Sequence, residues 1–258
     1  MKNNLKLTGV IICFLLTATS IAQTRIHASD IMKDIKSGKD ITYKNATIVG
    51  VLDFTFMDEQ LEKLPKKRKS NWWHNNNSDN KVEKQISNKI SFENCTFEDN
   101  VFAYIHEEDT KYTFIANFDD IAIFKNCVFK EMAQFKYSHF KTNADFSDSK
   151  FNGDTTFKYA NFKSDISFSN TIFGEASTFK YTVFNNKISF ANAIFKETAM
   201  FKYTKFKDGV SFHKTRFEED LNMKYTNVKG TFDISGMYVA YDVDAKYASI
   251  NGEKFRYH

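Results

Sequence analysis

Phenylalanine recurs in this sequence with a spacing that alternates between five and six residues. From Phe124 to Phe217 the pattern holds at eighteen consecutive positions without a miss. Steps of five and six residues would turn an α-helix by about 140° and 240° and so scatter the rings around it. A β-structure fits, because the residue two before each Phe is small or apolar and residues two apart on a strand point the same way. We therefore predict very short strands with inward side chains, separated by corners.

A longer period shows how many strands make one turn. The unit Phe135-Lys136-Tyr137 returns every 22 residues, and it persists as Met223-Lys224-Tyr225 after the Phe array ends. Each 22-residue period contains four Phe-type positions. Four faces per coil are thus expected, with equivalent residues of neighbouring coils stacked about 4.8 Å apart.

The repeat units also resemble a known family. Units such as Phe124-Lys-Asn-Cys-Val-Phe129 and Phe190-Ala-Asn-Ala-Ile-Phe195 are similar to those of pentapeptide-repeat proteins, in a Phe-rich variant with an 11-residue double repeat, of the exported bacterial type. The resemblance covers about residues 92–250, and residues 43–54 keep the same spacing. It implies an all-β fold, a right-handed quadrilateral parallel β-helix. The five-plus-six spacing departs from the family's pattern and predicts a wider coil.

Composition supports an ordered, repetitive chain. The 258 residues include 28 Phe and 12 Tyr but one Pro and nine Gly, which argues against a disordered or collagen-like protein. That single Pro, Pro65, falls in an insertion and interrupts no strand ladder. A net charge of +4 excludes a polyanionic tail or a strongly basic nucleic-acid arm.

The N-terminus has the pattern of a secretory signal peptide. Lys2 and Lys6 precede an apolar stretch at residues 7–16, and Ser20 and Ala22 are small residues suited to cleavage after Ala22. The apolar stretch is about half of the roughly 20 residues needed to span a bilayer. We therefore expect a secreted, periplasmic or cell-envelope protein, with a mature net charge of about +2 and no transmembrane segment in the mature chain.

The remaining sequence divides around the repeats. Residues 23–42 are predicted to form an N-terminal cap with a short helix at residues 30–36, for which Ser29 is the N-cap. Residues 43–56 form a first partial coil, residues 57–90 an insertion loop, and residues 91–250 the β-helix. A hairpin is expected at about residues 103–113, and residues 251–258 form a C-terminal cap.

Two cysteines fall on one face of adjacent predicted coils. Cys95 and Cys127 both stand two residues before a core Phe and therefore point inward. An exported protein allows a disulfide at this separation, but in-register parallel neighbours are awkwardly oriented for one. Both a disulfide and a pair of stacked thiols remain open.

Three outward features are candidates for binding. A basic and aromatic insertion could contact a membrane surface or glycan, or could be a solvated loop; it contains Lys66, Lys67, Arg68, Lys69, Trp72 and Trp73. An acidic column contains Glu131, Glu175, Glu197 and Glu219, and balancing the charge of the basic residues is a sufficient explanation of it. The third is a lysine–tyrosine column of Lys136, Tyr137, Lys158, Tyr159, Lys180, Tyr181, Lys202, Tyr203, Lys224, Tyr225, Lys246 and Tyr247.

That column has two interpretations. Stacked like charges repel in water by up to about 1 kcal/mol per neighbour, so a column that keeps them suits an anionic partner. Alternatively, stacked tyrosines stabilise the corner while the lysines keep the face soluble.

The sequence contains little that points to chemistry. Its six histidines show no metal-ligand spacing, no phosphate-binding glycine loop is present, and we expect no cofactor and no metal. Parallel β-helices can host glycan-cleaving acids, so a glycan-active enzyme using Asp119 and Asp120 stays an alternative.

We therefore expect an exported, non-enzymatic structural or interaction module that presents a rigid surface to an unidentified envelope, glycan or protein partner.

The resemblance to pentapeptide-repeat proteins also implies other properties. Some family members are DNA mimics that bind type II topoisomerases, but mimicry needs an acidic surface and a cytoplasmic location, and we expect no nucleic-acid partner here. Family members often pair through a solenoid end, which leaves a homodimer open, with Phe255-Arg256-Tyr257 as a contact or a cap.

Overall fold

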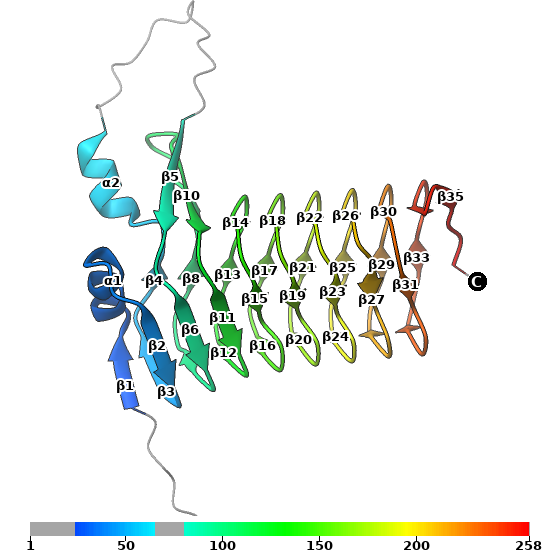
Figure 1. Cartoon of the computed structure of the whole chain (residues 1–258), viewed down its shortest axis with the longest axis horizontal. Coiled ribbons are helices and arrows are strands. Elements are labelled where there is room, and N and C mark those ends of the chain that lie inside the picture. Colours follow the sequence, from blue (N-terminus) through cyan, green and yellow to red (C-terminus); the bar gives the residue numbers. More distant parts are fainter. Residues whose placement is uncertain (1–23, 65–79, 258) are drawn as a thin grey trace, which may run out of the picture.

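The computed structural model describes residues 24–64 and 80–257. The chain winds as a four-sided coil whose short strands stack into four long parallel sheets, as Figure 1 shows. We number the faces 1 to 4 in the order in which the chain visits them from residue 41 onward. The β-helix predicted from the Phe spacing is confirmed.

The strands of each face follow one another along the solenoid axis. Face 1 contains β2 (Ile41–Lys44), β6 (Ile90–Glu93), β11 (Ala122–Lys125), β15 (Ala144–Asp145), β19 (Ile166–Ser167), β23 (Ile188–Ser189), β27 (Val210–Ser211) and β31 (Phe232–Asp233). Face 2 contains β1 (Thr24–His27), β3 (Ala46–Val49), β7 (Thr96–Phe97), β12 (Val128–Phe129), β16 (Lys150–Phe151), β20 (Ile172–Phe173), β24 (Ile194–Phe195), β28 (Arg216–Phe217) and β32 (Tyr238–Val239).

The other two sheets complete each coil. Face 3 contains β4 (Leu52–Asp53), β8 (Val101–Phe102), β13 (Ala133–Gln134), β17 (Thr155–Thr156), β21 (Ser177–Thr178), β25 (Ala199–Met200), β29 (Leu221–Asn222) and β33 (Val243–Asp244). Face 4 contains β5 (Lys81–Ile86), β10 (Thr113–Phe118), β14 (His139–Phe140), β18 (Asn161–Phe162), β22 (Val183–Phe184), β26 (Lys205–Phe206), β30 (Asn227–Val228), β34 (Ser249–Ile250) and β35 (Glu253–Lys254), with β9 (Tyr104–His106) paired to β10.

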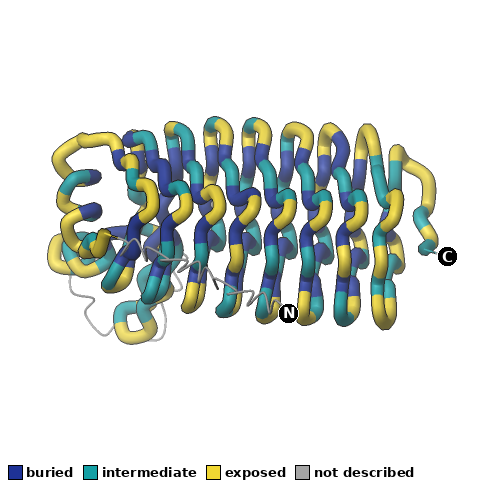
Figure 2. The backbone as a smooth tube through the Cα atoms, turned by 90° about the horizontal axis from the view of Figure 1, so that it is seen from below, coloured by how far each residue is buried: buried dark blue, intermediate teal, exposed yellow. Residues whose placement is uncertain are grey.

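Strand register confirms the 22-residue coil. Ala144 of β15 pairs with Ile166 of β19, and Ile166 pairs with Ile188 of β23, so every core position meets its equivalent one coil later. Buried and exposed residues alternate along each coil, as Figure 2 shows.

The core is a stack of phenylalanine rings. Phe168 is fully buried, stacked between Phe146 at 5.1 Å and Phe190 at 5.3 Å, with edge contacts to Phe157 and Phe179. Five buried threonines fill smaller inward positions, and each of their hydroxyls donates to the carbonyl of a core Phe; they are Thr171, Thr182, Thr204, Thr215 and Thr226. Thr182 Oγ1, for example, donates to the Phe157 carbonyl at 2.7 Å. These hydrogen bonds satisfy polar groups that burial would otherwise leave unpaired.

The N-terminal end is covered by a helix, but its start differs from the prediction. Helix α1 (Ala28–Lys36) begins at once after β1, with His27 as the N-cap residue, so Ser29 lies inside the first turn and caps nothing. The reason is that residues 24–27 pair with β3 as a further strand of face 2. Ile31 and Ile35 of α1 are buried against the first coil.

The region predicted as an insertion loop, residues 57–90, is partly regular. It contains helix α2 (Met57–Lys63) and strand β5, which pairs with β10 over six residues. The expected hairpin is present as β9 and β10, an antiparallel pair. No helix of the described residues is long and apolar enough to cross a membrane.

Candidate functional site

One edge of the solenoid collects three features that are far apart in the sequence. We call it the 3–4 edge, because the chain passes there from face 3 to face 4. In the first coil the insertion leaves from β4 and returns at β5, and in the second coil the hairpin lies between β8 and β10. Figure 1 shows α2 and the hairpin rising beyond the row of coils at this edge. In the six coils that follow, the lysine–tyrosine column occupies the same corner.

The six tyrosines of the column form one continuous stack. Successive ring centroids lie 4.6–4.8 Å apart, and the first five rings are parallel to within 5°. The last pair, Tyr225 and Tyr247, is tilted by 21°. Because each ring covers the faces of its neighbours, the stack presents ring edges to solvent between its two ends.

Each tyrosine sits in an unusual backbone conformation. Tyr137, Tyr159, Tyr181, Tyr203, Tyr225 and Tyr247 all have φ between 59° and 63°, the left-handed region that side chains seldom adopt. The diagonally opposite edge, between faces 1 and 2, makes the same corner mostly with asparagine. There Asn170 and Asn192 have φ of 58° and 57°, and the Asn192 Nδ2 donates to the Asn170 Oδ1 at 3.1 Å. The corner geometry therefore does not itself require tyrosine.

The lysines lie along the tyrosine stack. In Lys136, Lys158, Lys180, Lys202 and Lys246 the Nζ lies 5.1–5.3 Å from the ring centroid of the next residue, within cation–π range. Lys224 instead pairs with Asp244 at 2.7 Å. Desolvation, together with the charges of Lys136 and Lys180, lowers the pKa of Lys158. The column thus holds cations in a row against their mutual repulsion.

The hairpin closes the N-terminal end of the column. The Lys136 Nζ donates to the Tyr104 hydroxyl at 2.9 Å and lies 4.4 Å from that ring's centroid. From β5, the Lys81 Nζ lies 5.6 Å from the Tyr137 ring centroid. Tyr104 and Lys81 are therefore parts of the site that sequence spacing could not identify, because both lie outside the 22-residue period.

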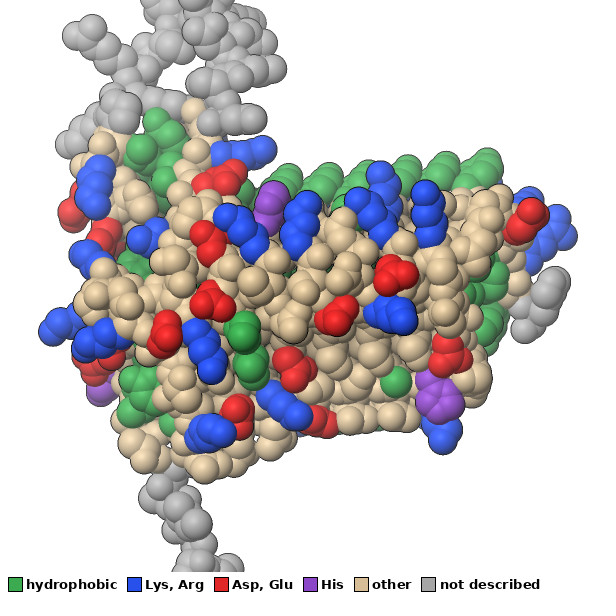
Figure 3. Space-filling view, viewed as in Figure 1, with side chains coloured by type: hydrophobic (Ala, Val, Ile, Leu, Met, Phe, Trp, Pro, Cys, Tyr) green, Lys and Arg blue, Asp and Glu red, His purple; other side chains and the backbone are tan. Residues whose placement is uncertain are grey.

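A second basic row flanks the same face. After each strand of face 4 the chain reaches the edge between faces 4 and 1, where the 22-residue spacing places Lys141, Lys163, Lys207 and Lys229. Lys141 pairs with Asp119 at 2.8 Å. Figure 3 shows hydrophobic side chains in a row along the 3–4 edge with lysine or arginine side chains beside them. The predicted acidic column, which includes Glu175 and Glu197, lies elsewhere, between faces 2 and 3.

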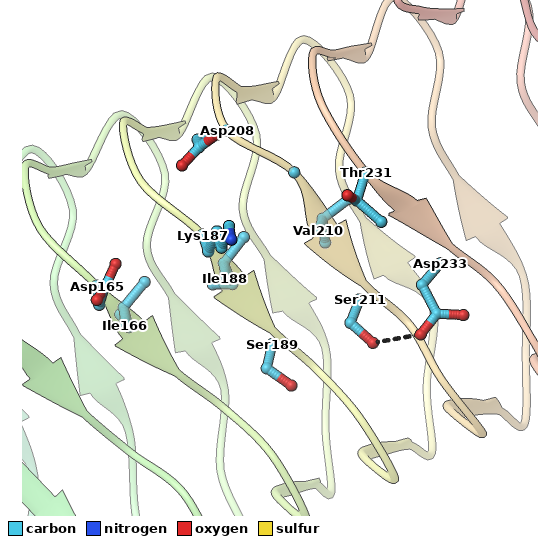
Figure 4. Close-up of a pocket in the computed structure, with 11 residues that line it drawn as sticks. Asp165, Ile166, Lys187, Ile188, Ser189, Asp208, Val210, Ser211, Thr231 and Asp233 are labelled. Carbon is cyan, nitrogen blue, oxygen red and sulfur yellow. Dashed lines mark hydrogen bonds between the residues drawn. The ribbon is translucent and has the colours of Figure 1, made fainter.

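Face 1 carries a shallow hollow of about 460 Å³, drawn in Figure 4. Ile166, Ile188 and Val210 are among its apolar residues, and Ser211 Oγ donates to Asp233 Oδ2 at 3.0 Å. Hydrogen bonds, led by that from the Ser235 side chain, lower the pKa of Asp233. This carboxylate is therefore ionised at neutral pH and unsuited to act as a general acid.

The two aspartates suggested as a catalytic pair are engaged in local structure. Asp119 is ion-paired with Lys141, and the Asp120 Oδ1 accepts a hydrogen bond from the Ile121 N–H at 2.6 Å. Within residues 24–64 and 80–257, no cluster of three or more His, Cys, Asp or Glu side chains is placed to hold a metal ion.

The cysteines point into the core as predicted from their spacing. Cys95 and Cys127 are free and buried, and their thiols lie 3.3–3.5 Å from backbone carbonyl oxygens. Burial raises the pKa of the Cys127 thiol. The basic and aromatic segment Lys66, Lys67, Arg68, Lys69, Trp72 and Trp73 lies outside the described residues.

Comparison with known proteins identifies the repeats. A family model described as pentapeptide repeats, nine copies long, matches residues 116–160 and 179–227. The matched residues span most of the coils that carry the lysine–tyrosine column. No curated protein and no solved structure matches the chain.

Proposed function

Because this chain is a pentapeptide-repeat protein, from a family of repeat scaffolds, we propose that it is a non-enzymatic interaction module that binds an anionic partner along the 3–4 edge. The proposal also places the protein outside the cytoplasm, on the signal-peptide pattern that ends at Ala22. Its partner is an anionic component of the cell envelope or its surroundings.

The observation that carries the proposal is the lysine–tyrosine column itself. The opposite edge shows that asparagine satisfies the same left-handed corner, yet the 3–4 edge uses tyrosine six times. Tyrosine gains stacking energy there, about 0.5–1.5 kcal/mol per pair, but stacking does not need an adjacent lysine. A cation–π contact with the ring adds about 0.5–1 kcal/mol for each lysine, and repulsion between neighbouring lysines offsets it, so folding alone does not account for the repeated lysine.

Electrostatics favours an anionic partner. Two lysine charges about 5 Å apart repel by roughly 1 kcal/mol in water, and each inner lysine of the column has two such neighbours. A bound polyanion would turn that repulsion into attraction. The second basic row, with Lys163 and Lys229, adds positive potential beside the same face.

The remaining alternatives draw less support. A DNA mimic needs a markedly acidic surface, whereas the most regular charged row of the described residues is basic. A glycan-active enzyme needs a carboxylic acid held neutral near another carboxylate. Asp119 is engaged in an ion pair with Lys141, and Asp233 has a lowered pKa. Burial raises the pKa of Asp53, but its two carboxylate oxygens accept hydrogen bonds from Thr55 and Met57 in its own loop.

A binding screen tests the proposal. The full chain is compared with the triple variant Lys158→Gln, Lys180→Gln, Lys202→Gln on anionic and neutral polysaccharides and on anionic and zwitterionic vesicles. The matched control is Lys125→Gln, Lys150→Gln, Lys196→Gln, which removes the same charge from exposed lysines on other parts of the coil. We expect the ladder variant to lose at least tenfold in affinity for anionic probes while the control stays within threefold of the original chain. Equal affinity of the ladder variant and the original chain would overturn the proposal.

A further inference from the structure

We propose that the partner is a single extended acidic polysaccharide that lies along the solenoid axis on the lysine–tyrosine column, with one end in a basic pocket at the C-terminal coil. This inference rests on the proposed function and adds the shape and chemical class of the ligand.

The column is a straight, one-dimensional row. Six coils at about 4.8 Å per strand step give a length of about 24 Å, with one lysine for each step. The parallel rings of Tyr137 to Tyr203 and the strand ladders beneath them fix that spacing. Such a row matches a linear chain whose acidic groups repeat along its length better than it matches a compact anion, which would reach only two or three lysines.

A membrane surface fits this edge poorly. The hairpin and α2 rise beyond the coils at the N-terminal end of the edge, as Figure 1 shows. A flat bilayer resting on them would be held away from the lysines of the nearest coils. A single chain avoids this obstacle, because it can run from the hairpin, at Tyr104 and Lys136, toward the C-terminus.

A nucleic acid also fits poorly, for a different reason. Proteins that bind single strands use exposed aromatic faces on which the bases stack, and that stacking supplies much of the affinity. Within the column both faces of each inner ring are covered by neighbouring tyrosines at 4.6–4.8 Å. The column therefore offers charges and ring edges but no stacking platform, which favours a polyanion without bases.

The C-terminal end of the column has a pocket that could bind the end group of the ligand. A depression of about 500 Å³ adjoins the last tyrosine of the stack and is lined by Lys246, Tyr247, Lys254 and Arg256, together with Phe255 and Tyr257. Three of these side chains are cationic, and Lys246 belongs to both the column and the pocket. Arginine and lysine at one end of a cationic row can bind the acidic end group of a chain that lies along the row.

The dependence of affinity on oligosaccharide length distinguishes this inference from the proposed function, which requires only an anionic partner. The probes are heparin-derived oligosaccharides of defined size, from four to sixteen sugars, titrated into the full chain by fluorescence anisotropy at several salt concentrations. We expect affinity to rise with length until the oligosaccharide spans the column and then to level off. The ladder variant Lys158→Gln, Lys180→Gln, Lys202→Gln should lose at least tenfold and show a shallower salt dependence, because fewer counterions are displaced.

A pocket variant tests the end contact. Lys246→Gln with Arg256→Gln should weaken the oligosaccharides of every length by at least threefold, while Lys125→Gln with Lys150→Gln should not. Circular dichroism and thermal unfolding check that each variant keeps its fold. A pocket variant that binds like the original chain would remove the end site and overturn the inference.

Competing ligands give distinct outcomes. Vesicles containing phosphatidylglycerol and an oligothymidylate of equal charge are titrated in parallel. If either binds more tightly than the oligosaccharide, or if affinity does not depend on length, the polysaccharide inference is wrong while an anionic partner stands. If none of the three anionic probes binds, the proposed function itself fails.

Discussion

The ring of Tyr159 lies parallel to that of Tyr181, with centroids 4.7 Å apart and planes 5° apart, although the two residues are separated by one full coil. The spacing equals that of neighbouring strands, so the rings stack because the backbone beneath them repeats. The same repeat places Lys158 above Lys180. A side chain that recurs once per coil therefore forms a continuous row on the surface.

Replacing a stacked tyrosine should cost stability through its neighbours. Tyr181→Asn introduces a residue that adopts the left-handed conformation with less strain, but it removes two ring contacts. We therefore expect the free energy of unfolding to fall by about 1 kcal/mol, the net of the lost stacking and the relieved backbone strain. Urea unfolding measures it, with Tyr241→Asn at a 66% exposed position as the control. A double-mutant cycle of Tyr159 and Tyr181 should show coupling of about 0.5–1.5 kcal/mol. Zero coupling would show that the stack contributes nothing.

The core Phe array should be intolerant of truncation. Phe168→Ala removes a fully buried ring that contacts six others and should cost about 3–5 kcal/mol. Since each coil supports only its neighbours, we also expect a broader, less cooperative thermal transition. Ser167→Ala, one residue away and outward, is the control. Thermal unfolding of Phe168→Ala that matches the original chain would contradict the packing described here.

The charge of Lys158 should work against folding. Desolvation and the charges of Lys136 and Lys180 lower its pKa in the folded state, so in the window between that lowered pKa and the unfolded value the unfolded chain binds more protons. Stability should therefore rise with pH across that window by more in the original chain than in Lys158→Gln. At pH 7 and low salt we expect Lys158→Gln to unfold at an equal or higher temperature, with added salt reducing the difference. A variant clearly less stable at low salt would mean that the contact with Tyr159 outweighs repulsion.

The cysteines should behave as shielded thiols. Cys95 and Cys127 are each 1% exposed, and burial raises the pKa of the Cys127 thiol. The hydrogen bond with Cys127 lowers the pKa of the Cys95 thiol to about 7, but burial keeps reagents away from both sulfurs, so neither should react with a thiol reagent until the protein unfolds. Intact mass before and after reductant gives an independent check. A native mass lower by two hydrogens that reductant restores would show a disulfide instead.

The C-terminal end should mediate self-association. Phe232, Met237 and Val239 in the last coil are only partly buried, and within the described residues no further strand follows β31, β32 or β33 in its sheet. Partly exposed apolar side chains beside unpaired strand edges favour pairing with a second copy. We expect a concentration-dependent dimer in sedimentation velocity and a monomer for Val239→Lys. A monomer at all concentrations of the original chain would rule this out.

The sequence by itself determined the coil. Inward side chains, the 22-residue turn and the lysine–tyrosine column all follow from spacing within one repeat, since each 22-residue unit packs only on its neighbours. Where the chain leaves that period, residue spacing no longer predicts the structure. Nothing in the sequence indicated β1, Ser29 was predicted as the N-cap that His27 provides, and α2 and β5 were predicted to be parts of a loop.

Only the tertiary structure decided what shares the 3–4 edge. An insertion carries no periodic signal to tell at which corner it departs. The pairing of β4 with β8, and of β5 with β10, fixes that corner. These long-range hydrogen bonds bring the insertion, the hairpin and the lysine–tyrosine column together on one side, and they place Tyr104 against Lys136. The lysine–tyrosine column itself follows from the 22-residue period, whereas its junction with the insertion and the hairpin is set by strand pairing between residues that the period does not relate.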